Sequence, residues 1–159
     1  MARNAASGNP ESTMLKAIAL ALLLLAPTTA FAATRAAVEQ AIEDNLGAPD
    51  VYEEAFDAIQ QAVVDNDAAR LAQWVSFPIT VKMGDKQITL KDADDFVAAY
   101  PKLFTDGIKN AVINQKFEDI FVNYQGLMFG NGQIWMNGIC KTDACETVDV
   151  RIITIQEAY

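Results

Sequence analysis

Carboxylates and tyrosines are the side chains that remain for acid/base chemistry in this chain, because its 159 residues include no histidine. Without imidazole, the usual serine and cysteine triads are excluded. After residue 32 the chain holds a single serine, Ser76, and its context "VSFP" lacks the glycines of a nucleophile elbow. Most acids of the first long helix fall opposite its apolar stripe, which is the pattern of a solvated surface. These acids are Glu53, Glu54, Asp57 and Asp65.

Asp149 and Arg151 are a charged pair that strand geometry would bring together, because residues two apart lie on the same face of a strand. Two interpretations stay open. A carboxylate tuned by a neighbouring arginine is a group that can do acid/base chemistry. An exposed pair of this kind is otherwise a surface ion pair worth less than about 1 kcal/mol. We favour the surface ion pair.

Residues 14–32 have the parts of a secretory signal peptide: an early lysine, an apolar run and the small-x-small end Ala30-Phe31-Ala32. The apolar run is shorter than the roughly 20 residues that a membrane span needs. We therefore expect residues 1–32 to be a leader and signal peptide that is removed. The exported chain then begins near Ala33, in the periplasm or outside the cell, and does not insert into a membrane.

The rest of the chain is long enough for one domain with its own core. Residues 33–49 read as an N-terminal arm or short helix, and residues 50–159 as a single domain. The formal net charge is −9. An acidic chain is repelled by nucleic acid, which rewards basic patches, so we expect no nucleic-acid partner.

Cys140 and Cys145 are the chain's two cysteines, and they flank the sequence "KTDA". In an oxidising compartment paired thiols become disulfides, so we expect a bridge between them. We expect no metal site and no cofactor, because histidine and a second cysteine pair are missing. If the two cysteines stand opposite each other in a hairpin, Trp135 faces Val150 and Asn137 faces Val148.

That register places Trp135 on the more uniformly apolar face, which we expect to be covered by helices. Gln133 and Asn137 then become polar groups beside a tryptophan on an apolar concave wall, as in small-molecule sites. The alternative is that both polar residues lie near strand ends and contact water. Trp74 and Tyr100 are further candidates to line a pocket, although packing in the core is the ordinary role of such aromatics.

The stretch "GLMFGNGQIWM", residues 126–136, is rich in glycine but does not fit a phosphate loop. A Walker-type loop needs Gly-Lys-Ser/Thr, and a dinucleotide fingerprint needs a helix after the glycines. Here an alternating, strand-like sequence follows. We expect Asn131-Gly132 to form a hairpin turn, and Gly126 to mark a bend or bulge.

Apolar spacing predicts helices first and strands last. We expect helices over 34–45 and from a capping box at Asp50, a short helix capped by "DND" at 65–67, and a hairpin over 77–90 that turns at Gly84-Asp85. A helix interrupted at Pro101 and another capped by Thr105 follow, and strands fill the chain from Phe117. This order predicts an α+β fold with helices packed on a curved antiparallel sheet.

The stretches "DNDAARLAQWVSFPI" and "IFVNYQGLMFGNGQIWM", within roughly residues 50 to 156, resemble exported bacterial members of the nuclear transport factor two-like, or SnoaL-like, superfamily. The resemblance implies a cystatin-like cone in which the sheet and helices enclose a pocket. Isomerases, dehydratases, hydrolases and non-catalytic binders share that fold, so it does not decide the function.

Three functions are compatible with these residues. The first is an exported domain that binds a small apolar molecule in a concave pocket without catalysis. The second is an isomerase, dehydratase or hydrolase that uses a carboxylate or tyrosine in the pocket. The third is a protein-partner or inhibitor module of the envelope. A homodimer through the sheet is a further expected partnership.

Overall fold

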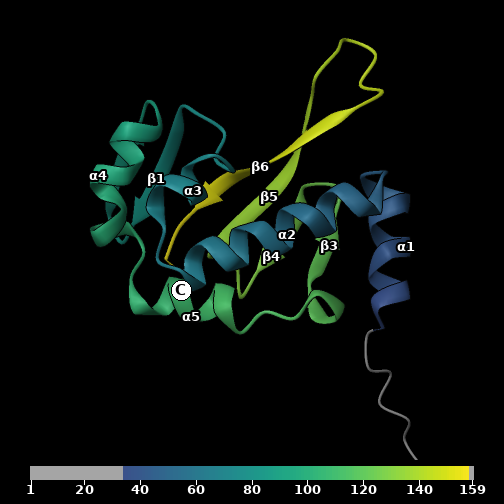
Figure 1. Cartoon of the computed structure of the whole chain (residues 1–159), viewed down its shortest axis with the longest axis horizontal. Helices are drawn as coiled ribbons and strands as arrows, with labels where there is room; N and C mark the ends of the chain where they lie inside the picture. The colour runs from purple at the N-terminus through teal and green to yellow at the C-terminus, as the bar shows by residue number, and fades with distance from the viewer. Residues whose placement is uncertain (1–33, 158–159) are drawn as a thin grey trace, which may run out of the picture. The chain divides into compact units, whose positions relative to one another are not determined.

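The computed structural model describes residues 34–157, so the expected signal peptide lies outside the described residues. Helices come first and the larger sheet last, as Figure 1 shows. The elements are α1 (Arg35–Asn45), α2 (Pro49–Val64), α3 (Ala68–Ala72), β1 (Ile79–Met83), β2 (Lys86–Leu90), α4 (Ala93–Leu103), α5 (Asp106–Ile113), the 3₁₀ helix η1 (Phe117–Asp119), β3 (Phe121–Asn123), β4 (Gly126–Phe129), β5 (Ile134–Cys140) and β6 (Val148–Ile155).

Helix α2 is the long amphipathic helix that the spacing of apolar residues predicts. Its side chains at Tyr52, Phe56, Ile59 and Val63 are all buried. The expected capping box at Asp50 is wrong, since the helix begins at Pro49 and Ala48 precedes it without a side-chain cap. Proline is well suited to the first helical position because it has no N–H to leave unpaired.

The shorter helices begin where side-chain caps were expected. Asp67 caps α3 and Thr105 caps α5, each accepting a hydrogen bond from a backbone N–H three residues on. The expected interruption at Pro101 is wrong, because α4 continues to Leu103. Pro101 lies in the last turn, where its missing N–H removes one backbone bond while the buried Tyr100 and Leu103 still hold the turn against the core.

The strands form a four-stranded antiparallel sheet, in the order β3-β4-β5-β6, and a two-stranded β1-β2 hairpin. The turn expected at Gly84-Asp85 joins β1 to β2, and the turn expected at Asn131-Gly132 joins β4 to β5. Two parallel bridges attach residues 75–82 to β6 and to the residue after it: Val75 to Ile152, and Lys82 to Gln156. The predicted α+β class with helices against antiparallel sheet is confirmed.

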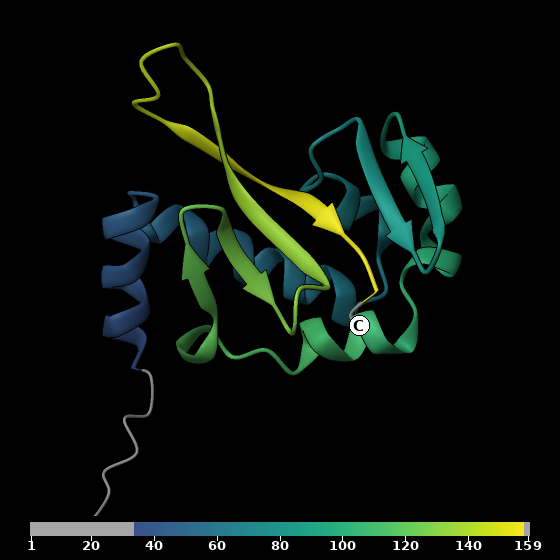
Figure 2. The same cartoon turned by 180° about the vertical axis from the view of Figure 1, so that it is seen from behind.

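One face of the four-stranded sheet is covered by helix α2, and we call it the covered face. Phe56 of α2 stacks on Phe129 of β4, with ring centroids 5.0 Å apart. Leu127, Ile134 and Met136 are completely buried on the same face. The opposite face, which we call the open face, turns toward the reader in Figure 2, where the strands stand in front of α2.

The expected register of the last hairpin is wrong. Cys140 stands opposite Val148, and Asn137 stands opposite Arg151 instead of Val148. The disulfide joins Cys140 to a residue of the loop, Cys145, and not to its partner across the ladder. The loop therefore extends over 141–147, and the pairing of β5 with β6 is displaced from the expected one.

The expected assignment of the two sheet faces is also wrong. Trp135 is half-buried on the open face and pairs with Thr154, next to a β-bulge between Trp135 and Met136. Met136 lies on the covered face opposite Ile152, and both are completely buried. The expected face depends on the apolarity of the cross-strand partners, and a displaced register changes those partners.

We expect Gly126→Ala to destabilise the fold strongly. Gly126 has φ +124°, and a Cβ there would lie 2.1 Å from the carbonyl oxygen of Met136. The close approach of β4 to β5 therefore has no room for a methyl group, and we expect the free energy of unfolding to fall by about 3 kcal/mol. Gly84→Ala is the matched control: φ is +57° in open space, so only backbone strain of about 1 kcal/mol is expected. Equal losses in denaturant melts would contradict this account.

Candidate functional site

The sequence-predicted pocket residues lie in separate places on the domain. Trp135 projects from the open face and lines a shallow hollow of about 260 Å³ with Gln125, Ile153 and Thr154. Its ring meets the edge of Phe121, with centroids 6.2 Å apart and planes at 84°. Trp135 is therefore part of an aromatic pair on the sheet surface.

Gln133 lies two residues before Trp135, in the turn that precedes β5. It lines a hollow of about 240 Å³ with Thr105, Gly107, Ile108 and Glu157. Its side-chain Oε1 accepts a hydrogen bond of 2.6 Å from the Asn131 N–H. The side chain thus closes its own turn, in agreement with the alternative that it lies near a strand end.

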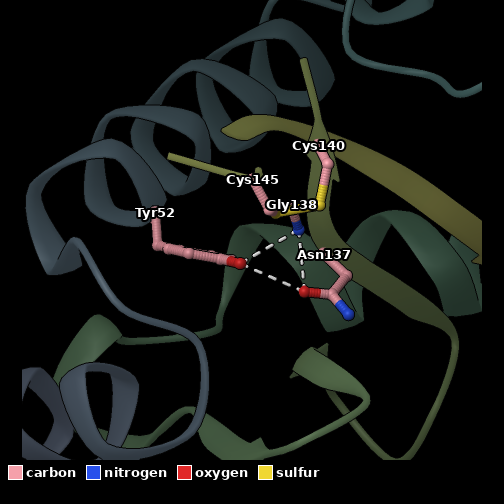
Figure 3. The surroundings of a disulfide bond; sticks show 5 residues. All are labelled: Tyr52, Asn137, Gly138, Cys140 and Cys145. Atoms are coloured by element: carbon pink, nitrogen blue, oxygen red, sulfur yellow. Dashed lines mark hydrogen bonds between the residues drawn. A yellow bond between two sulfur atoms is a disulfide. The ribbon is translucent and has the colours of Figure 1, made fainter. Parts of the chain in front are cut away.

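Asn137 is held by a hydrogen-bond cluster where β5 extends past the start of β4 (Figure 3). Its Oδ1 accepts from the hydroxyl of Tyr52 at 3.1 Å and from the Gly138 N–H at 2.7 Å. The Tyr52 hydroxyl also accepts from the Gly138 N–H, at 3.0 Å. Beyond Gly126, β4 no longer supplies backbone partners to β5, so these side-chain oxygens replace them.

Gly138 has to be small at this point. A Cβ on Gly138 would lie 2.7 Å from the Tyr52 hydroxyl oxygen. Burial raises the pKa of Tyr52, while the Gly138 N–H opposes part of that rise. The Oδ1 of Asn137 thus takes part in hydrogen bonds that hold the β5–β6 hairpin against α2.

Trp74 packs partly buried against the core and lies beneath the Arg151 guanidinium, whose carbon is 6.0 Å from the ring centroid. Arg151 also donates to the Gln73 carbonyl and forms an ion pair with Asp149 at 2.5 Å. The pair expected from the strand spacing is therefore present. Both side chains are partly exposed, so its contribution to stability is that of a surface pair.

Tyr100 lies deep between helices, and its hydroxyl is buried without a hydrogen-bond partner. The ring stacks on Phe104 with centroids 4.6 Å apart, and the Lys109 ammonium lies 5.5 Å from the ring centroid. Burial raises the pKa of Tyr100, and the negative charge of Asp67 adds to the rise. Tyr100 is not among the residues that line the four surface hollows described in this section.

The open face carries apolar residues that sequence reasoning did not single out. Phe121 is 50% exposed, and Met128, which stands between Phe121 and Trp135 in the sheet, is half-buried. Nearby, Tyr124 is 75% exposed. The sequence does carry a signal for this surface, because β3, β4 and β5 place large apolar residues on both of their faces. A strand with one solvated face normally alternates apolar residues with polar ones.

A second hollow of interest lies where the loop of the β5–β6 hairpin approaches the connection between α1 and α2. It has a volume of about 250 Å³ and is lined by residues from 46–51 and 145–148. The expected disulfide is confirmed in the wall of this hollow: Cys140 and Cys145 are bonded, with Cα atoms 4.7 Å apart (Figure 3). A further hollow on the outside of α2 is lined mainly by charged and amide side chains.

Within residues 34–157, no three histidine, cysteine or carboxylate side chains gather in a way that could hold a metal ion. In the same part of the chain, each helix is too short or too polar to cross a membrane.

Comparison with known proteins does not assign the chain to a family. No protein-family model matches the chain, and neither a curated protein nor a solved structure matches it significantly.

Two phenylalanine replacements should differ in their effect on stability. Tyr52→Phe removes two hydrogen bonds of a buried hydroxyl, so we expect a loss of about 1 kcal/mol. Tyr100→Phe removes a buried hydroxyl that has no partner, so we expect no loss or a gain of up to about 1 kcal/mol. Urea melts of the two variants beside the wild type measure the difference. A loss for Tyr100→Phe as large as that for Tyr52→Phe would show that the Tyr100 hydroxyl has a partner.

The raised pKa of Tyr100 predicts a loss of stability at alkaline pH. In the unfolded chain tyrosine ionises near pH 10. Above that pH the unfolded chain releases the proton while the folded hydroxyl retains it, so the free energy of unfolding falls as pH rises. Below about pH 10 this effect is absent. Tyr100→Phe should therefore show a shallower fall between pH 9 and 11.5 than the wild type, and parallel curves would refute the link.

Proposed function

We propose that this chain is an exported binding domain without catalysis of its own, and that it acts through the open face of its four-stranded sheet. The observation that carries this proposal is an aromatic pair on that face, formed by the exposed Phe121 and the half-buried Trp135. Apolar side chains gathered on one exposed surface are a common mark of a protein-binding site. Aromatic residues in particular dominate the energetics of such sites.

The partner that we propose for the open face is a second copy of the chain. Pairing two acidic chains is opposed by charge, and the formal net charge is −9. The row of Phe121, Met128 and Trp135 across the open face avoids that cost because it is uncharged. Asp149, farther along the β5–β6 hairpin, is paired with Arg151. Two such faces can meet through apolar contact while the acidic helices point away from each other.

Binding of a small apolar molecule in a concave pocket is the second candidate. Its support is the sequence resemblance to the nuclear transport factor two-like, or SnoaL-like, superfamily, together with the packing of helices on one face of an antiparallel sheet. We propose membership of that superfamily, with its cystatin-like cone, on these grounds. Against an open pocket, the covered face is occupied by close packing such as the stack of Phe56 on Phe129.

An enzyme of the isomerase, dehydratase or hydrolase type is less well supported. It needs a tyrosine or carboxylate that substrate can reach. Among residues 34–157, Tyr100 has a buried hydroxyl without a hydrogen-bond partner, but it is 3% exposed, and its raised pKa makes it a poorer base at neutral pH. A binding domain, in contrast, needs only the apolar residues that the open face presents.

Replacing Trp135 tests the open face. We expect the purified protein to sediment as a concentration-dependent dimer, and Trp135→Ser to weaken association by at least about tenfold. Val64→Ser is the matched control, because Val64 is 52% exposed on α2, away from the open face, and its replacement should leave association unchanged. Denaturant melts of both variants separate lost association from lost folding. A wild type that stays monomeric at all concentrations would exclude a second copy as the partner.

A further inference from the structure

The hollow beside the disulfide is built from two segments that are far apart in the sequence. Leu46, Ala48 and Val51 form one wall, from the end of α1 to the start of α2. Residues 145–148, at the end of the β5–β6 loop, form the other wall. The hollow has a volume of about 250 Å³, which suits a molecule smaller than the drug-sized ligands of larger pockets.

Each wall of this hollow contains a residue with an unusual backbone conformation. Among residues 34–157, the non-glycine residues with positive φ are Ala48, at 47°, Asn66, at 53°, and Cys145, at 50°. Asparagine adopts this conformation comparatively readily, whereas alanine and cysteine do so at a cost. Two of these three residues line the same hollow. Strained backbone of this kind tends to gather at binding sites, where the surrounding structure holds it in place.

Both walls are fixed by bonds that do not depend on a ligand. The Leu46 and Gly47 N–H groups both donate to the Ile42 carbonyl, which closes the end of α1. On the other wall, the Cys145 N–H donates to the Thr142 carbonyl, and the bond to Cys140 ties the loop to β5. A site held in its binding shape loses less entropy when it takes up a ligand.

The chemistry of the lining selects the ligand. Leu46, Val51 and Val148 supply apolar contact, and Glu146 is the charged residue among those that line the hollow. The neighbouring carboxylate, Asp50, lies in the first turn of α2, where the positive end of the helix dipole already balances its charge. We propose that this hollow binds a compact apolar molecule that carries an amino group, with its apolar part between the two walls and its ammonium beside the Glu146 carboxylate.

Three matched probes test the class of ligand: 2-phenylethylamine, the neutral 2-phenylethanol and the anionic 3-phenylpropionate. Each is titrated into the oxidised, full-length protein at pH 7 while backbone amide NMR shifts are recorded. We expect the amine to shift amides of 46–51 and 145–148, with a dissociation constant of about 1 mM. The alcohol should bind about fivefold more weakly, and the propionate should bind more weakly still.

Charge-matched variants locate the ammonium. Glu146→Gln should remove the preference for the amine over the alcohol, whereas Asp143→Asn, in the same loop but outside the lining, should retain it. Val51→Ser should weaken both the amine and the alcohol. The double variant Cys140→Ser with Cys145→Ser should weaken all probes, because the loop wall is no longer tied to β5.

Three results would overturn the proposal: amide shifts that fall outside the two walls, equal binding of amine and propionate, or an unchanged preference in Glu146→Gln. The proposal does not rest on the function assigned to the open face. Trp135→Ser should leave amine binding unchanged, so the two proposals can fail separately. Amide spectra of each variant without probe show whether it has kept its fold.

Discussion

The packing of helix α2 on the covered face of the sheet is the interaction on which the other features depend. The apolar stripe of α2 presents Phe56 to Phe129 of β4, and the stacked rings lie among the completely buried side chains of β4 and β5. Burial of large apolar side chains is the main source of stability in a domain of this size. Because one face of the sheet is committed to α2, the other face has to meet water or a partner.

The same helix also holds the hairpin that extends from the sheet. Tyr52 lies at the start of α2, and its hydroxyl bonds to Asn137 and Gly138 where β4 stops supplying backbone partners. A buried backbone N–H without a partner is costly, so this contact determines where the β5–β6 hairpin can leave the sheet. The hairpin in turn carries the Cys140–Cys145 loop to the connection between α1 and α2.

The two recognition surfaces that we propose both depend on this arrangement, and they differ in character. The open face carries the exposed Phe121 beside the half-buried Trp135, and suits another protein surface. The hollow beside the disulfide is small, walled on two sides and carries one carboxylate, Glu146, and suits a compact molecule. Both surfaces contain apolar groups that gain free energy when water is removed.

The sequence by itself determined the features that depend on near neighbours or on composition. Caps such as Asp67 and Thr105 were predictable because a cap bonds to an N–H a few residues on, and the disulfide was predictable because the chain has one pair of cysteines. Only the tertiary structure decided that Cys140 stands opposite Val148 in the β5–β6 ladder and that Trp135 lies on the open face. Strand register depends on contacts between distant segments, and the side-chain period of two makes the faces depend on it. Where both faces of a strand carry large apolar residues, the packing of α2 decides which face is buried.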